Sequence, residues 1–323
     1  MQKAKTATEP LPTTTVSLVL GSGGARGLTH IGIIQWLEEH NYAIRSVAGS
    51  SIGAVVGGIF AAGKLAAYTE WVTALSRADV LLLLDFSFSR AGLFKGERII
   101  GLLKELIGDF NIEDLPISFT AVATDVAAGK EVWLNQGSLF DAIRASFAIP
   151  TLFTPHDYHG RRLLDGGLVN PVPIAPTLND MTDITIAVNL NGREQTLPVV
   201  SEEVSEPEEN DSHYRRRIRK FIDELSHRKH EKHDDWGFFE VIHHSLETMQ
   251  STISRLKLAA YSPDVIIDIP KNVCGPFEFY RAGEMIALGR QMAEAAFCGN
   301  SCSNDMGIIK NVNGSGFNTF NRV

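Results

Sequence analysis

A serine between two glycines is the residue of this chain best suited to nucleophilic chemistry. Gly49-Ser50-Ser51-Ile52-Gly53 forms a G-x-S-x-G pentapeptide between a short strand-like run and an apolar helix-like run. A sharp strand-to-helix turn holds such a serine hydroxyl out of the sheet, and the flanking glycines relieve the crowding. Unpaired N–H groups at the helix N-terminus favour negative charge beside it. The pattern predicts Ser51 as a nucleophile, with a glycine-rich packing turn as the alternative.

A second glycine-rich turn could stabilise the charge that such an attack creates. Residues 21–27 have the sequence GSGGARG and also lie between a predicted strand and a predicted helix. Small residues let backbone N–H groups approach a tetrahedral intermediate, as an oxyanion hole requires. A dinucleotide-binding fingerprint fits poorly, because Arg26 stands where its last glycine belongs and no acidic residue closes a second strand. A structural turn is the remaining alternative. The candidate oxyanion-hole residues are Gly23, Gly24, Ala25, Arg26, Gly27 and Ile52.

Asp165 is the candidate base. It follows the short apolar run 162–164 and precedes Gly166 and Gly167, so it could approach another turn closely, although Asp-Gly turns are common in any protein. Most later histidines lie in a highly charged stretch, and only about two strands fit before Ser51, fewer than the usual α/β-hydrolase builds. A Ser51–Asp165 pair is therefore favoured over a triad. Because a free aspartate has a pKa near 3.9, the pair requires burial or a short hydrogen bond to strengthen the base.

Taken in order, the three motifs resemble the patatin-like phospholipase family, and most closely its bacterial branch, related to the esterase domain of neuropathy target esterase. Similarity runs from about residue 16 to residue 297, apart from one charged segment. The sequence departs from the family at Thr151, where a glycine is usual. Further matching segments are 89–96, Ala123-Thr124-Asp125, 141–146, Ala148-Ile149-Pro150 and Asn170-Pro171-Val172-Pro173.

The resemblance implies an ester hydrolase that uses no metal or cofactor. Ser51 would attack the acyl carbonyl, and Asp165 would accept its proton. N–H groups around Gly23, Gly24 and Ile52 would hold the oxyanion, and water would release the acyl-enzyme. The implied substrate is a phospholipid or another acyl-ester lipid. A transacylase using the same serine and a non-catalytic lipid-binding regulator remain alternatives.

The hydrophobic pattern predicts the elements that must position these residues. Strand-like and helix-like runs alternate, which is typical of a parallel sheet covered by helices, so we expect a three-layer α/β/α fold. Predicted strands cover 15–20, 45–48, 117–124, 131–134, 162–164, 183–189 and 265–269. Predicted helices cover 28–40, 52–62, 97–107, 139–146 and 277–297. A further helix has the apolar stripe Trp236, Phe239, Ile242, Leu246, Met249, Ile253 and Leu256.

The predicted organisation is a flexible arm at 1–15, one hydrolase domain at 16–298 and a flexible tail at 299–323. A charged excursion at 193–235 interrupts the domain, with an acidic half followed by a basic half. Within it, apolar residues repeat at helical spacing from Tyr214 to Leu225 beneath a basic face. Such a helix could lie on an anionic membrane or pack against its own domain.

Composition narrows the class of protein. The 323 residues are 44% hydrophobic and carry a net charge of −8, which argues against a general nucleic-acid binder. Three cysteines, Cys274, Cys298 and Cys302, are too few for a disulfide framework and suggest a reducing, cytoplasmic compartment; a shared metal at the last two is disfavoured. The N-terminus has no apolar run typical of a signal peptide.

Two apolar stretches admit more than one interpretation. Residues 46–63 carry no charge and reach the length of a membrane span, but their many glycines favour a helix buried against the sheet. The cluster 81–94 could cap an acyl groove or belong to the core. Its large apolar members are 81–84, Phe86, Phe88, Leu93 and Phe94.

Overall fold

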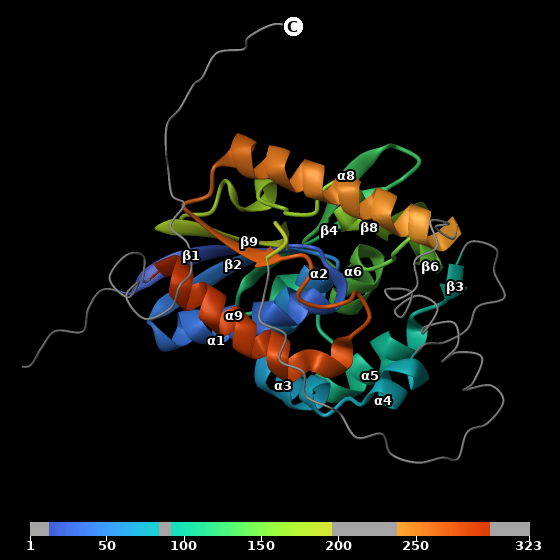
Figure 1. The fold of residues 1–323 in the computed structure, drawn as a ribbon, viewed down its shortest axis with the longest axis horizontal. Coiled ribbons are helices and arrows are strands. Elements are labelled where there is room, and N and C mark those ends of the chain that lie inside the picture. Colours follow the sequence, from blue (N-terminus) through green and yellow to red (C-terminus); the bar gives the residue numbers. More distant parts are fainter. Residues whose placement is uncertain (1–12, 84–91, 196–237, 298–323) are drawn as a thin grey trace, which may run out of the picture.

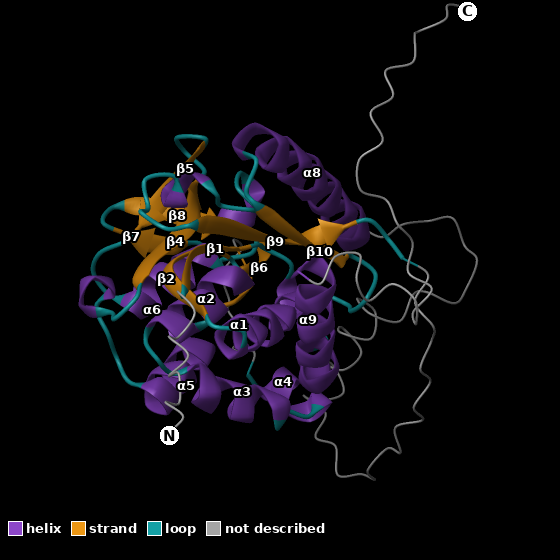
Figure 2. Ribbon diagram, turned by 90° about the vertical axis from the view of Figure 1, so that its left-hand side faces the viewer, coloured by secondary structure: helices purple, strands orange, loops and turns teal. Residues whose placement is uncertain are grey.

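A mixed β-sheet forms the middle layer of the molecule, with helices on both faces (Figure 1, Figure 2). The computed structural model describes residues 13–83, 92–195 and 238–297. Helix α8 (Phe238–Tyr261) covers one face of the sheet, while α1 (Thr29–Glu39), α2 (Ile52–Ala61) and α9 (Ala282–Phe297) cover the other. This arrangement confirms the predicted three-layer α/β/α fold.

The main sheet has the order β10-β9-β1-β2-β4-β8-β7, with β5 also paired to β4. The strands from β10 to β4 are parallel, whereas β5 and β8 join β4 antiparallel and β7 pairs antiparallel with β8. Their bounds are β1 Thr14–Leu20, β2 Tyr42–Ser50, β4 Ser118–Asp125, β5 Lys130–Leu134, β7 His156–Tyr158, β8 Arg161–Asp165, β9 Ile184–Gly192 and β10 Val265–Pro270. A separate parallel pair joins β3 (Gly92–Phe94) and β6 (Thr151–Phe153).

The register along β4 brings two distant segments together. β5 pairs with residues 121–125 of β4, so it occupies one edge of β4 along all of these residues. β2 pairs with residues 118–122 and β8 with 123–125, and both must therefore share the opposite edge. Ser50 lies opposite Val122, and Asp165 lies opposite Ala123. The carboxyl ends of β2 and β8 consequently meet end to end.

The remaining helices pack around this frame. They are α3 Leu65–Thr73, α4 Arg77–Leu82, α5 Glu97–Ile107 and α6 Leu139–Ser146, with short 3-10 turns η1 Gly24–Leu28, η2 Ile112–Asp114, η3 Gly166–Leu168, η4 Ala175–Thr177 and η5 Phe279–Arg281. Every residue of α2 is buried, which agrees with a helix packed against the sheet. Among the described residues, no helix is both long and apolar enough to cross a bilayer.

The predicted elements are present, with altered ends. The helices 97–107 and 139–146 keep their predicted bounds, while the strand 45–48 extends to Tyr42–Ser50. The last helix begins at Ala282 rather than 277, because η5 precedes it. Two members of the predicted apolar stripe on α8 are in fact exposed: Met249 to 54% and Leu256 to 66%.

Several predictions fall on segments that the structure leaves undescribed. The arm, most of the charged excursion and the tail overlap residues 1–12, 196–237 and 298–323, so the domain boundaries stay predictions. Of the apolar cluster at 81–94, Phe94 is buried in the core and Leu82 is exposed, whereas residues 84–91 lie outside the described part.

Candidate active site

Ser51 occupies a strained turn between β2 and α2. Its φ is 56°, in the left-handed region that residues with a side chain rarely adopt. The backbone around it is too crowded for any residue but glycine at the flanking positions. A Cβ on Gly53 would lie 2.1 Å from the Leu20 carbonyl oxygen, and one on Gly49 would lie 2.4 Å from that of Gly53. The strain and the close packing hold the Ser51 side chain at the end of the sheet.

Ser146, at the end of α6, holds the backbone of this turn. Its Oγ accepts a hydrogen bond from the Ser51 N–H at 2.9 Å and donates one to the Val122 carbonyl at 2.6 Å. Ser146 is completely buried. The sequence carries no signal for this role, because only the tertiary structure places the end of α6 behind the turn.

Asp165 meets Ser51 across a sequence separation of 114 residues. Ser51 Oγ donates a hydrogen bond of 2.5 Å to Asp165 Oδ2, and the Gly167 N–H donates one of 2.7 Å to Oδ1. The Thr124 hydroxyl donates to the Asp165 backbone carbonyl at 2.8 Å, which ties this residue to β4. The end-to-end meeting of β2 and β8 accounts for the contact.

Burial makes Asp165 a stronger base than a free aspartate. The residue is only 2% exposed, and desolvation raises its pKa to about 7, although the hydrogen bonds from Ser51 and Gly167 act to lower the pKa. A carboxylate with this pKa can accept a proton near neutral pH much more readily than one in water. The burial that the sequence-based hypothesis required is therefore present.

The glycine loop begins directly after β1 and lies against the start of α2. A Cβ on Gly27 would lie 2.2 Å from Ile52 Cγ2, and one on Gly167 would lie 2.4 Å from Ser22 Oγ. A Cβ on Gly166 would lie 2.6 Å from Ser50 Oγ. These approaches bring the three sequence motifs into one compact arrangement, as expected.

The predicted oxyanion-hole residues differ in what their N–H groups do. Those of Gly23, Gly24 and Ile52 donate to no acceptor within the described part of the chain. The prediction for Ala25 requires a correction, because its N–H already donates to the Pro276 carbonyl at 2.9 Å. Gly27 contributes close packing against Ile52.

Arg26 points into the protein rather than into solvent. Its side chain is buried, with 4% of the residue exposed. Its Nε donates to the Gly23 carbonyl at 3.1 Å and its Nη1 to the Lys271 carbonyl at 2.6 Å, while Nη2 lies 3.5 Å from Glu247 Oε1. The guanidinium thus anchors the loop to α8 and to the segment after β10.

A buried histidine also supports the loop. His30 Nε2 lies 2.9 Å from the Gly21 carbonyl, and burial lowers the pKa of His30 to about 4, which keeps the ring neutral. Helical spacing alone could not separate it from ordinary core positions. Among the described residues, no histidine is hydrogen-bonded to Ser51 or Asp165, and His244 is a surface residue near Glu247.

The described residues offer no group of side chains suited to a metal ion. Cys274 is a buried free thiol, and burial raises its pKa to about 12. The other two cysteines lie outside the described residues.

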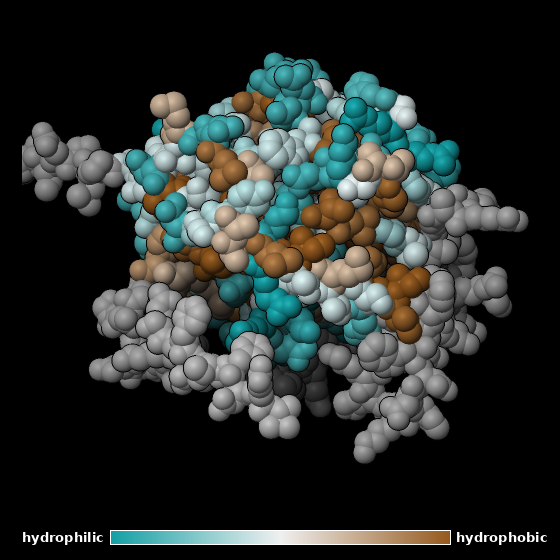
Figure 3. Space-filling view, turned by 90° about the horizontal axis from the view of Figure 1, so that it is seen from above, coloured by the Kyte–Doolittle hydropathy of each residue, from teal (hydrophilic) through white to brown (hydrophobic). Residues whose placement is uncertain are grey.

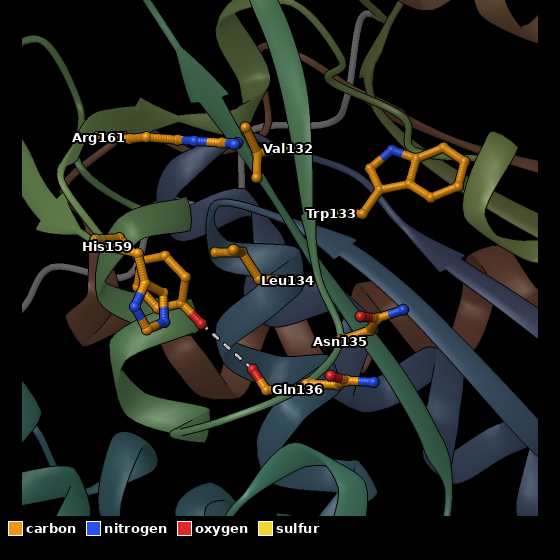
Figure 4. A pocket seen from close by; sticks show the side chains of 8 residues that line it. Val132, Trp133, Leu134, Asn135, Gln136, His159 and Arg161 are labelled. Atoms are coloured by element: carbon orange, nitrogen blue, oxygen red, sulfur yellow. Dashed lines mark hydrogen bonds between the residues drawn. The ribbon is translucent and has the colours of Figure 1, made fainter.

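Two hollows lie near the surface. One, of about 300 Å³, is lined by β5 and the β7–β8 hairpin, and includes Trp133, Tyr158 and Arg161 (Figure 4). None of its lining residues is hydrogen-bonded to the Ser51–Asp165 pair. The other, of about 170 Å³, lies along α8 beside the residues that anchor Arg26.

Comparison with known proteins identifies a family and several relatives. The family model for patatin-like phospholipase matches residues 18–178. An uncharacterized NTE family protein of Mycobacterium tuberculosis is 38% identical over 327 residues, covering 87% of this chain and 91% of that protein. Human patatin-like phospholipase domain-containing protein 6 is 34% identical over 194 residues, covering 56% of this chain and 14% of that protein.

Among solved structures, VipD from Legionella pneumophila aligns with a TM-score of 0.42 at 13% identity, covering 88% of this chain and 67% of that one. The family model includes all three motifs, and the mycobacterial similarity extends over most of both chains. The chain therefore belongs to the patatin-like phospholipase family, in the branch of the NTE family proteins.

Proposed function

We propose that this protein is a serine acyl-hydrolase that cleaves acyl esters of lipids through Ser51, Asp165 and a covalent acyl-enzyme. Membership of the family supports hydrolysis of lipid esters in general. The observation that carries the specific proposal is the 2.5 Å hydrogen bond from Ser51 Oγ to a buried carboxylate whose pKa burial raises to about 7. A strained serine beside such a base is typical of an activated nucleophile.

In the first step, Ser51 Oγ attacks the acyl carbonyl carbon while Asp165 Oδ2 accepts the hydroxyl proton. The tetrahedral intermediate collapses as the protonated Asp165 gives this proton to the leaving alkoxide. The released alcohol leaves an ester between the acyl group and Ser51. Water then attacks this ester while Asp165 accepts one of its protons. As the second tetrahedral intermediate collapses, Asp165 returns this proton to Ser51 Oγ and the fatty acid departs.

The negative charge on the carbonyl oxygen requires hydrogen-bond donors. The N–H groups of Gly23, Gly24 and Ile52 supply them in this proposal, and the positive end of the α2 dipole adds to their effect. The Ser51 N–H cannot take part, because Ser146 already accepts its hydrogen bond. One such donor typically contributes about 2.7–4 kcal/mol to transition-state stabilisation.

Hydrolysis of a short-chain chromogenic ester tests the proposal. Ser51→Ala is expected to reduce kcat by at least about 10³-fold, and Ser51 in the wild type should react with a fluorophosphonate probe. Ser50→Ala is the matched control, because Ser50 Oγ is buried beside the nucleophile and has no hydrogen-bond partner among the described residues. Equal activity in Ser51→Ala and wild type would contradict the proposal.

Acyl transfer to an alcohol would use the same residues, and product analysis with an added alcohol acceptor distinguishes it from hydrolysis. A non-catalytic regulator would fail both the ester and the probe assay. The expectation of a reducing, cytoplasmic compartment rests on the low cysteine count and stays a prediction.

The proposed substrates reside in membranes, so we also propose peripheral contact with a lipid surface. Val241, Met249 and Leu256 are exposed at spacings of one face of α8, and Figure 3, which looks down on this side, shows hydrophobic groups separated by hydrophilic ones. Leu256→Glu is expected to weaken flotation with anionic liposomes, whereas Met181→Glu on the exposed turn before β9 is not. Equal flotation of both variants would contradict this role for α8.

A further inference from the structure

The segment between β10 and α9, residues 271–281, lies against the glycine loop at residues 21–27. Its Pro276 carbonyl accepts the Ala25 N–H at 2.9 Å, and its Lys271 carbonyl accepts Arg26 Nη1 at 2.6 Å. A Cβ on Gly24 would lie 2.6 Å from the Pro276 carbonyl oxygen, so the two backbones approach as closely as glycine allows. The segment therefore holds the loop through its own backbone carbonyls.

Two successive peptide units of the loop are fixed by these contacts. Because a trans peptide is planar, its C=O and N–H point in opposite directions. Arg26 Nε donates to the Gly23 carbonyl at 3.1 Å, so it also sets the direction of the Gly24 N–H. The hydrogen bond from Ala25 to Pro276 fixes the next unit. The Gly24 N–H is one of the donors assigned to the oxyanion in the proposed function, and its orientation depends on both contacts.

Glu278 holds the turn that presents the Pro276 carbonyl. Its Oε2 accepts the Gly275 N–H at 2.9 Å and a hydrogen bond from Arg281 Nη1 at 2.9 Å, and its Oε1 accepts the Tyr280 hydroxyl at 3.2 Å. Gly275 directly precedes Pro276, so the hydrogen bond to its N–H fixes the backbone next to the carbonyl that binds the loop. One carboxylate thus joins the backbone of this turn to two side chains at the start of α9.

Both ends of the segment are anchored to the rest of the fold. The Lys271 N–H donates to the Gly192 carbonyl, at the end of β9, at 3.2 Å. At the other end, α9 packs so closely on α1 that a Cβ on Gly32 would overlap the Ile286 carbonyl oxygen. The turn at 275–278 lies between these anchors, and its shape depends on the side chain that closes it.

We propose that Glu278 is a positioning residue for the reaction at Ser51, because it sets the Pro276 carbonyl that orients the oxyanion donors of the glycine loop. The proposal rests on the proposed function and extends it to a side chain that is hydrogen-bonded to neither Ser51 nor Asp165. Desolvation acts to raise the pKa of Glu278, but the hydrogen bonds from Gly275 and Arg281 outweigh it and lower the pKa. The carboxylate is therefore ionised at neutral pH and accepts these hydrogen bonds.

Kinetics on a short-chain chromogenic ester test this role. Glu278→Ala is expected to lower kcat about tenfold with KM little changed, because misdirected donors weaken the transition state more than the bound substrate. The affinity for an alkyl trifluoromethyl ketone, which forms a tetrahedral oxyanion adduct with a serine, should fall by the same factor. Glu278→Gln keeps an acceptor for the Gly275 N–H and should recover most of the loss.

Glu284→Ala is the matched control. Glu284 is the other carboxylate bound to Arg281, with Oε2 at 2.7 Å from Nη2, and it makes no listed contact with the turn at 275–278. Its removal should leave kcat and the inhibitor affinity unchanged. Equal losses in Glu278→Ala and Glu284→Ala would overturn the proposal, and so would a rise in KM at constant kcat in Glu278→Ala.

Amide hydrogen exchange separates this proposal from the function on which it rests. Exchange of the Ala25 N–H is measured by NMR on Ser51→Ala protein, so it needs no turnover. Adding Glu278→Ala should speed this exchange about tenfold, and adding Glu284→Ala should not. Unchanged exchange, or faster exchange without a loss of kcat in the Glu278→Ala enzyme, would show that the positioning role is wrong. Failure of the proposed function would instead appear as equal ester hydrolysis by Ser51→Ala and wild type, whatever the exchange rates.

Discussion

The turn at Ser51 and the glycine loop at residues 21–27 meet at one site but are held in different ways. Around Ser51 the backbone is enclosed by steric contacts, such as the 2.1 Å that would separate a Gly53 Cβ from the Leu20 carbonyl oxygen. The loop is tied instead by polar contacts to late segments, since Arg26 binds Glu247 and Lys271 across 221 and 245 residues. One added methyl group is enough to disrupt the close packing around Ser51. The polar contacts of the loop can instead be removed one at a time, each with a smaller loss. The two regions should therefore respond differently to substitution.

Gly53→Ala is expected to have the largest effect. The added methyl group cannot coexist with the Leu20 carbonyl, so β1 and α2 must separate, at a cost of roughly 3 kcal/mol or more in the free energy of unfolding. Chemical denaturation measures this cost. Gly101→Ala is the matched control, because a Cβ there meets nothing within 4 Å and alanine favours the α5 helix by about 0.5–1 kcal/mol. Similar stabilities for the two variants would refute steric enclosure of the turn.

Ionisation of Asp165 should make activity and folding stability change with pH in opposite directions. Activity needs the carboxylate, so kcat/KM should rise with pH and level off above about 7. Folding stability should fall over the same range, because the folded state holds the proton more tightly than the unfolded chain, whose aspartate has a pKa near 3.9. The stabilising contribution is complete below about pH 4 and is lost as pH rises through about 7.

The Asp165→Asn variant tests whether Asp165 causes this pH dependence of stability. The variant should be inactive yet more stable than wild type by up to about 4 kcal/mol above pH 7, with the difference shrinking towards pH 4. Thermal or denaturant unfolding across this range provides the measurement. A stability difference that does not change with pH would show that the buried carboxylate is not the titrating group.

Ser146→Ala removes the two hydrogen bonds that hold the backbone of the Ser51 turn. The Ser51 N–H and the Val122 carbonyl would be left without partners in a buried setting, which costs about 1–3 kcal/mol. We expect kcat and the rate of fluorophosphonate labelling to fall by about tenfold or more, with KM little changed, because the position of the nucleophile is altered rather than the binding of substrate. A rise in KM at constant kcat would contradict this positioning role.

Glu247→Gln weakens one contact that holds the glycine loop, and the glutamine side chain has nearly the same shape as glutamate. The Arg26 ion pair would become a neutral hydrogen bond, so we expect a smaller loss of kcat, within about tenfold. Glu70→Gln on α3 is the control for charge. If Glu247→Gln reduced kcat more than Ser146→Ala does, the loop rather than the turn would be the more sensitive region.

Thr151→Gly should have the smallest effect, and a favourable one. Thr151 has a φ of 68°, in the left-handed region that favours glycine. A β-branched residue in this region is strained by about 1–2 kcal/mol, so glycine should stabilise the fold by about 1 kcal/mol after its greater chain entropy is counted. Unchanged activity together with a higher melting temperature would confirm that the strain has no catalytic use.

The order of residue types along the chain determined the secondary structure and the recognisable motifs of this protein. Alternating strand-like and helix-like runs predicted the layers of the fold, and α5 and α6 have their predicted bounds because their periodicity and flanking residues agree. The motifs at Ser51, the glycine loop and Asp165 were recognisable because each needs residue types that few other backbones require. Patterns of this kind depend on neighbours along the chain, which the sequence displays directly.

Tertiary structure alone decided the rest. Only the pairing of β2 and β8 along one edge of β4 brings the Ser51 hydroxyl to Asp165, and only burial raises the pKa of that aspartate. The buried contacts of the Arg26 side chain and the hydrogen bond from the Ala25 N–H likewise depend on segments more than 200 residues away. Contacts over such separations are set by how whole elements pack, and no local pattern of residue types records them.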